Sequence, residues 1–105
     1  MEKIYTDILG RVIRFTKERY DHIVQFHPEL LKYIETIRIS LEDPEFIVQS
    51  NTDNSVELFY HYFVSTSIGD KWLCVVVKFL QEDYFIITVY FTDKIKNGDI
   101  KWKKN

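Results

Sequence analysis

The chain has 105 residues, of which 46% are apolar and 29% charged. This length predicts one domain over residues 1–105, and the composition excludes a disordered or low-complexity segment. The 14 basic and 16 acidic residues give a formal charge of −2, which excludes a global field that would draw the protein to nucleic acid or anionic lipid.

The first residues and the single cysteine indicate the cellular compartment. Residues 1–4 do not form a charged-then-apolar leader, and no apolar run approaches the length of a membrane span. Cys74 lies inside the apolar segment 72–77, so we interpret it as a packed, unreactive side chain. We therefore expect a cytoplasmic protein without membrane contact.

The first forty residues predict a hairpin and two helices. Residues 3–8 and 11–15 have strand character and are joined at Gly10, which can adopt the backbone angles of a tight turn. Thr16 offers an N-cap for a helix over 17–26. The apolar face of that helix comprises Tyr20, Ile23, Val24 and His27.

Pro28 separates this helix from a second one. Proline disfavours helical angles at His27 but suits the first position of a new helix. The second helix is predicted to run to residues 42–44, and its apolar stripe comprises Leu30, Ile34, Ile37 and Leu41. The two helices should meet at an angle, with His27 at the corner.

From residue 45 onward the apolar period changes to two. Segments 46–50, 56–65, 71–80 and 84–92 predict four strands connected by hairpins. The fold class predicted is α+β, in which two N-terminal helices pack on a four-stranded antiparallel sheet that is preceded by a short N-terminal hairpin. The lysine-rich tail after residue 93 is interpreted as a solvated terminus, with phosphate binding as the alternative.

Alternation assigns the faces of the last two long strands. The core face is predicted to carry Leu73, Val75, Val77, Phe79, Phe85, Ile87, Val89 and Phe91. The opposite face is predicted to carry Trp72, Lys78, Thr88 and Tyr90, with Tyr60 and Tyr62 on the adjacent strand. Such a face could stack bases and hold a phosphate, or be a solvent-facing sheet of good strand formers.

The histidines are the candidate proton-transfer groups, because imidazole titrates near neutrality. His22 and His27 are five residues apart, which places them on different helix faces, and no ligand set completes a metal site. His22 lies beside Arg19 and Phe26, off the apolar stripe. His61 alternates with Tyr60 and is interpreted as packed.

Several segments resemble a known nuclease family. They are Arg14-Phe15-Thr16-Lys17-Glu18-Arg19-Tyr20-Asp21-His22-Ile23, His27-Pro28-Glu29-Leu30, Leu41-Glu42-Asp43-Pro44-Glu45 and Ile87-Thr88-Val89-Tyr90. Together they are similar to the phage-type branch of the barnase, EndoU, colicin and RelE-like nuclease superfamily. The resemblance implies a toxin-like domain that cuts RNA without a metal or cofactor, by attack of a 2′-hydroxyl on the adjacent phosphorus.

The resemblance also assigns site residues. It implies catalytic roles for His22 and His27 and a polar pair of Thr88 and Tyr90, to which the strand pattern adds Lys78 as an electrostatic clamp. The predicted RNA-binding residues are Arg14, Arg19, Tyr60, Tyr62 and Trp72. Two positions depart from the pattern: Phe26 stands where related sequences often have a basic residue, and Val89 replaces a small residue.

A second hypothesis is a noncatalytic module whose aromatic sheet face binds a protein or RNA. Under the nuclease hypothesis the partners considered are an RNA substrate and a cognate inhibitor protein. Under the module hypothesis the partner is another protein, RNA or a second copy of the chain.

Overall fold

The computed structural model of the protein describes residues 2–105. The elements in chain order are β1 (Lys3–Thr6), β2 (Val12–Phe15), α1 (Lys17–Phe26), the 3₁₀ helix η1 (Pro28–Tyr33), α2 (Ile34–Glu42), β3 (Phe46–Gln49), β4 (Val56–Thr66), β5 (Gly69–Leu80), β6 (Asp83–Thr92) and β7 (Ile100–Lys103). The predicted α+β class is confirmed.

The sheet is larger than the sequence predicts. It has seven strands in the order β1-β2-β6-β5-β4-β3-β7, rather than four. The N-terminal hairpin joins the sheet because β2 runs parallel to β6, with Arg14 opposite Phe85. All other neighbouring strands are antiparallel.

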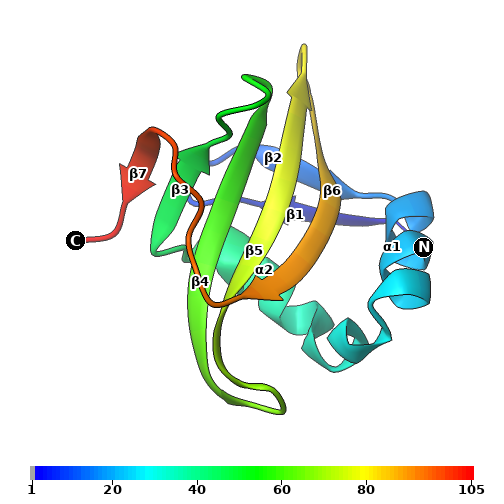
Figure 1. Cartoon of the computed structure of the whole chain (residues 1–105). Coiled ribbons are helices and arrows are strands. Elements are labelled where there is room, and N and C mark those ends of the chain that lie inside the picture. The colour runs from blue at the N-terminus through cyan, green and yellow to red at the C-terminus, as the bar shows by residue number, and fades with distance from the viewer. Residues whose placement is uncertain (1) are drawn as a thin grey trace.

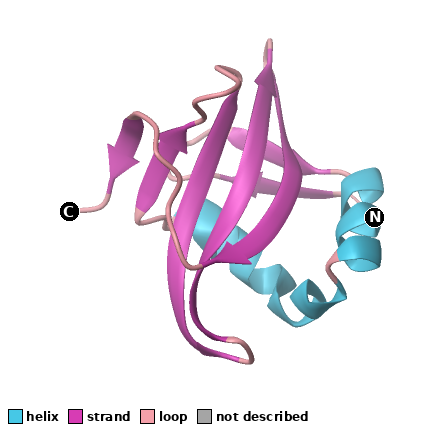
Figure 2. Ribbon diagram, viewed as in Figure 1, coloured by secondary structure: helices cyan, strands magenta, loops and turns pink. Residues whose placement is uncertain are grey.

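The helices lie together on one side of the sheet, which we call the helix face (Figures 1 and 2). α1 has the predicted bounds, and the Thr16 hydroxyl caps it by accepting a hydrogen bond of 3.2 Å from the Arg19 amide. The segment after Pro28 begins as a 3₁₀ helix and becomes α-helical only at Ile34, so the second predicted helix is divided.

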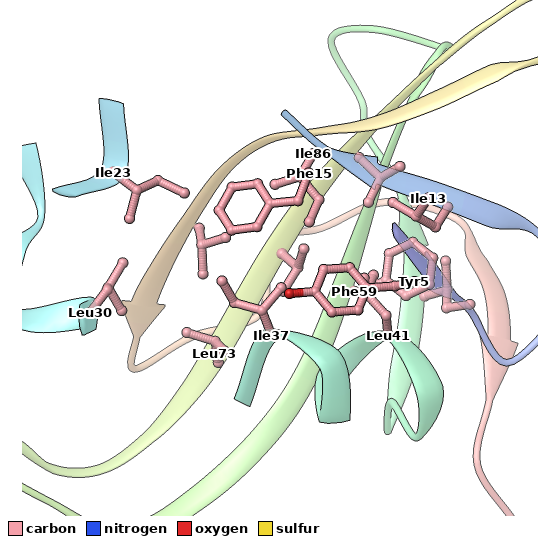
Figure 3. Packing of buried hydrophobic residues seen from close by; sticks show 14 residues of the cluster. Tyr5, Ile13, Phe15, Ile23, Leu30, Ile37, Leu41, Phe59, Leu73 and Ile86 are labelled. Atoms are coloured by element: carbon pink, nitrogen blue, oxygen red, sulfur yellow. The ribbon is translucent and has the colours of Figure 1, made fainter. Parts of the chain in front are cut away.

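The main core fills the space between the helices and the sheet (Figure 3). Ile23 of α1, Leu30 of η1 and Ile37 of α2 are each at most 2% exposed. They pack with the inward side chains of β5, of which Leu73, Val75 and Val77 are fully buried. Hydrophobic burial between these elements therefore fixes the helices to the sheet.

The β1–β2 turn is held to the centre of the sheet by ion pairs. Gly10 has a φ of 82°, as the turn requires. The buried Asp7 carboxylate accepts hydrogen bonds from the Leu9 and Arg11 amides at 3.0 and 2.8 Å. The Arg11 guanidinium contacts both Asp7, at 2.8 Å, and Glu57 of β4, at 2.9 Å. Such a buried charge is stable only while it is paired.

The other side of the sheet, the open face, is shaped by a bulge in β6. Val76 pairs with Thr88, whereas the next residue, Val77, pairs with Ile86, so Ile87 is an extra residue. The predicted core positions of Phe85 and Ile87 are therefore wrong. Ile86 is buried in the helix-face core, while Ile87 packs on the open face. Phe85 is the cross-strand partner of Lys78 on that face.

Residues 93–99, which we call the strap, connect β6 to β7 across the open face beside β4 (Figure 1). The Lys96 amide donates to the Tyr60 hydroxyl at 3.0 Å, and the Gln49 amide donates to the Asp99 carbonyl at 2.8 Å. The tail beyond the strap is the edge strand β7, and Trp102 packs against the main core. The prediction of a solvated terminus is therefore wrong for β7. Among residues 2–105, no helix is long and apolar enough to cross a membrane.

Gly98 is where the strap comes closest to the sheet. A Cβ atom there would overlap the Gln49 carbonyl oxygen and lie 2.8 Å from Val48 Cγ1. We expect Gly98→Ala to lower the free energy of unfolding by about 1–3 kcal/mol, because backbone must move to admit the methyl group. Urea unfolding measures this change. The exposed neighbour Asp99→Ala is the control, with an expected effect of about 0.5 kcal/mol or less, and equal stabilities for the two variants would contradict the close approach.

Candidate functional site

The open face contains a cleft of about 600 Å³, which we call the central cleft. Its floor is apolar and comprises Val56, Leu58, Val76 and Ile87. Thr88 and Tyr90 of β6 line it on one side. Residues 50–53 and the strap residues Lys96 and Asn97 form its rim, where the Asn51 side-chain Nδ2 atom donates to the Asn97 backbone carbonyl at 2.8 Å. The cleft therefore combines an apolar floor with a polar rim.

Lys78 stands beside this cleft in an ion pair. Its Nζ atom donates to Asp53 Oδ2 at 3.0 Å, and its cross-strand partner Val56 lies on the cleft floor. The Ser55 hydroxyl and amide donate to Asp53 Oδ1 at 2.6 and 2.9 Å. The hydrogen bonds from Ser55, followed by that from Lys78, lower the pKa of Asp53 to about 2. Lys78 thus positions the rim of the cleft.

Beneath the strap, three polar groups are buried together. Burial raises the pKa of the Tyr60 hydroxyl to about 12 and that of the Cys74 thiol to about 11. Burial also raises the pKa of Tyr90, whose hydroxyl has no hydrogen-bond partner among the described residues. Tyr60 is fully buried, so the predicted role of its ring in stacking RNA bases is wrong. A thiol with a raised pKa is a poor nucleophile.

A second depression, the helix-edge groove, has a volume of about 390 Å³ and lies where α1 begins beside β6. Its lining residues are Arg14, Thr16, Glu18, Arg19, Leu80, Asp83 and Phe85. The Arg14 guanidinium makes two hydrogen bonds of 2.9 Å to Asp83 and one of 3.2 Å to Glu2. Among residues 2–105, no carboxylate forms an ion pair with Arg19.

The histidines lie outside both depressions. His22 is three residues beyond Arg19 and four beyond Glu18, so the three side chains project from the same side of α1. Its half-buried ring packs on the Phe26 ring, and the two ring centroids are 4.8 Å apart. His27 ends α1, and its Nδ1 atom lies 3.6 Å from Glu29. Of the two, only His22 is one helical turn from the groove residues Glu18 and Arg19.

A row of side chains connects the two depressions across four strands. Val56 pairs with Lys78, Lys78 with Phe85, and Phe85 with Arg14. Cross-strand partners lie on the same face of a sheet. The open face therefore carries an aromatic ring between two cations, with the central cleft at one end and the helix-edge groove at the other.

The remaining aromatic residues are at the far end of the open face. Tyr62 and Trp72 are in contact, with ring centroids 5.0 Å apart, and Tyr62 is 41% exposed. Neither residue lines the central cleft or the helix-edge groove. The structure thus divides most of the predicted site into three groups: Arg14, Arg19 and His22; Lys78, Thr88 and Tyr90; and Tyr62 with Trp72. His27, at the end of α1, and the buried Tyr60 belong to none of them.

The sequence interpretation missed Glu18 and Phe85 as candidate site residues. Glu18 precedes His22 by one helical turn, a spacing that could have indicated it. Phe85 was assigned to the core because the bulge is not visible in the apolar run Phe85-Ile86-Ile87. Over the described residues, no three or more histidine, cysteine, aspartate or glutamate side chains are grouped to hold a metal ion.

Comparisons with protein-family models, with curated proteins and with solved structures find no match to this chain.

The low pKa of Asp53 predicts an acid-sensitive rim. Because the folded-state pKa of about 2 lies below the ordinary value of 3.8, the stabilisation from this carboxylate is present above about pH 3.8 and is lost as the pH falls through 2. We expect NMR titration of the carboxyl carbon to show ionisation near pH 2. Ser55→Ala should raise this pKa more than Lys78→Met does, since the Ser55 hydroxyl makes the largest contribution; the reverse order would contradict this assignment.

Proposed function

We propose that the protein is an endoribonuclease that cleaves RNA without a metal ion, with its reaction centre at the helix-edge groove. The main support for this proposal is that Arg14, Arg19 and Glu18 line one groove, while His22 follows one helical turn later on the same side of α1. These are two guanidinium groups for a phosphate, together with a carboxylate and an imidazole for proton transfer. The proposal differs from the hypothesis drawn from the sequence in two ways. It adds the Glu18 carboxylate, and it places the reaction in the helix-edge groove, apart from Thr88 and Tyr90.

The chemistry requires two proton transfers. The Glu18 carboxylate takes the proton of the ribose 2′-hydroxyl as that oxygen attacks the neighbouring phosphorus. The bond between phosphorus and the 5′-oxygen breaks, and the His22 imidazolium gives its proton to the departing oxygen. The products are a 2′,3′-cyclic phosphate and a 5′-hydroxyl. The guanidinium groups of Arg14 and Arg19 stabilise the charge that develops on the phosphate oxygens.

The row of Arg14, Phe85 and Lys78 supports a path for the rest of the strand. Adjacent strands are about 4.8 Å apart, so the backbones of Arg14 and Lys78 lie at nearly equal distances on either side of the half-buried Phe85. A base can stack on an aromatic side chain while the cations contact the backbone. Because the net charge of the chain is −2, binding depends on this local row.

A second candidate function is a protein-binding module. It is favoured by apolar side chains on the β4–β5 hairpin, where Val64 is 67% and Ile68 48% exposed beside Tyr62. Tyrosine and exposed apolar side chains are typical of interfaces. A stable complex or dimer that shows no RNA cleavage would favour this module.

The nuclease proposal predicts different effects for two histidine substitutions. His22→Ala should lower the rate of RNA cleavage by about a hundredfold to ten-thousandfold, the usual contribution of a positioned imidazole. His27→Ala should leave the rate nearly unchanged, because His27 lies at the opposite end of α1 from the groove. The assay uses end-labelled single-stranded RNA in the presence of a chelator.

The control for folding is the circular dichroism spectrum and the unfolding midpoint of each variant, which should match the parent. Detection of the 2′,3′-cyclic phosphate identifies the reaction. Parental cleavage by His22→Ala, or products that carry a 5′-phosphate, would overturn the assignment of His22 and the mechanism.

A further inference from the structure

The central cleft has the size of a small-molecule site and an apolar floor. Its floor is formed by side chains of three adjacent strands, Leu58 of β4, Val76 of β5 and Ile87 of β6. The bulge places Ile87 and Thr88 in the cleft together, opposite Val76. A volume of about 600 Å³ falls within the range of small-molecule sites. The floor can therefore contact the flat face of a heterocycle.

The rim offers hydrogen-bonding groups of both kinds. The Asn97 side-chain amide and the Thr88 hydroxyl make no hydrogen bond within the described part of the chain, while the Asn97 backbone carbonyl is used by Asn51. A side-chain amide both donates and accepts, as does a hydroxyl. These groups match the mixed donor and acceptor edge of a nucleobase, and a purely apolar ligand would leave them unpaired.

One cation at the rim is available for a phosphate. The Lys96 ammonium lies 5.8 Å from the centre of the Tyr90 ring, and within residues 2–105 it forms no ion pair. The nearby carboxylate of Asp53 is already bound by Lys78 and Ser55. The rim therefore favours a ligand with a negative charge beside its ring.

From these features we infer that the central cleft binds one unpaired nucleotide of the RNA, with its base on the floor and its phosphate at Lys96. This inference rests on the proposed nuclease function, because it makes the cleft the specificity subsite for the helix-edge groove. Ile87 of the cleft and Phe85 of the groove are two residues apart on β6, or about 6.6 Å. The near edges of the cleft and the groove are thus neighbours along β6, so that one RNA strand can reach both.

The position of the cleft also specifies the substrate class. A base can enter only if it is unstacked and unpaired, as in a single strand, a loop or a bulge. The substrate is therefore single-stranded RNA, and a continuous duplex should be cleaved at least tenfold more slowly than the same sequence as a single strand.

The direct test is to titrate the protein with each of the four nucleoside 5′-monophosphates and to detect binding from the NMR signals of the Val76 and Ile87 methyl groups. We expect at least one nucleotide to shift these signals at millimolar concentration. Lys96→Ala should weaken nucleotide binding roughly tenfold or more, without affecting the weaker binding of the uncharged nucleoside. Lys94→Ala is the matched control, since Lys94 is an exposed lysine of the same strap that does not line the cleft.

Asn97→Ala tests recognition of the base. The substitution keeps the backbone carbonyl that accepts from Asn51, so the rim stays in place while the side-chain amide is lost. We expect weaker nucleotide binding and reduced sequence preference in RNA cleavage. The absence of methyl shifts with all four nucleotides, together with unchanged cleavage by Asn97→Ala and Lys96→Ala, would overturn the subsite.

The two proposals fail separately. His22→Ala should bind nucleotides as the parent does, because His22 lies outside the cleft. Nucleotide binding in the cleft without RNA cleavage by the parent would overturn the nuclease proposal alone. Cleavage by the parent without nucleotide binding in the cleft would overturn the subsite alone.

Discussion

The extra residue in β6 determines which side chains the open face presents. Before the bulge, Ile86 points into the main core and Phe85 pairs with Lys78 on the open face; after it, Val89 is buried in the core and Tyr90 lies under the strap. In a regular strand, alternate residues share a face, so a strand with Val89 and Phe91 in the core would also have Phe85 in the core. The row of Lys78, Phe85 and Arg14 therefore exists because one residue is inserted opposite Val76.

Local sequence signals place the groove next to this row. β2 ends at Phe15, Thr16 caps α1, and the first helical turn begins at once. Arg14 projects from the strand and Arg19 from the helix, so the strand-to-helix transition brings two guanidinium groups to the same groove within six residues. The parallel pairing of β2 with β6 then sets Arg14 beside Phe85. The groove thus depends on one local cap and one long-range pairing.

The sequence predicts the helices and strands better than it predicts which strands pair with one another. The bounds of α1 and the inward row of β5 follow from local periodicity and capping, which act over a few residues. The position of β2 beside β6 joins residues about seventy positions apart, and no local pattern specifies such a pairing. β7 was missed because lysines flank Trp102 and hide a strand whose ring packs on the core. The three consecutive apolar residues 85–87 fit either register, so alternation could not locate the bulge.

The same division applies to the candidate site. Helical spacing pointed to His22 beside Arg19, and the apolar strand pattern pointed to Lys78, because charged and titratable residues stand out in an apolar pattern. Glu18 was overlooked because an acidic residue in the first turn of a helix is already explained by its favourable interaction with the helix dipole. Which of these groups share a depression depends on the fold of the whole sheet. The two histidines, close in sequence, lie in different places because α1 ends at Phe26, before His27.

The distribution of charges along the open face adds a final constraint. Arg14 in the helix-edge groove and Lys78 beside the central cleft are paired with Asp83 and Asp53. In contrast, Arg19 of the groove and Lys96 of the cleft rim have no ion-pair partner within the described residues. The paired cations are partly exposed, and such pairs are worth about 0–1 kcal/mol, so an arriving phosphate can replace a carboxylate at small cost. The unpaired cations attract a phosphate without such an exchange. In the proposed function, an RNA strand would therefore be held first at Arg19 and at Lys96, and its middle would then lie across Phe85.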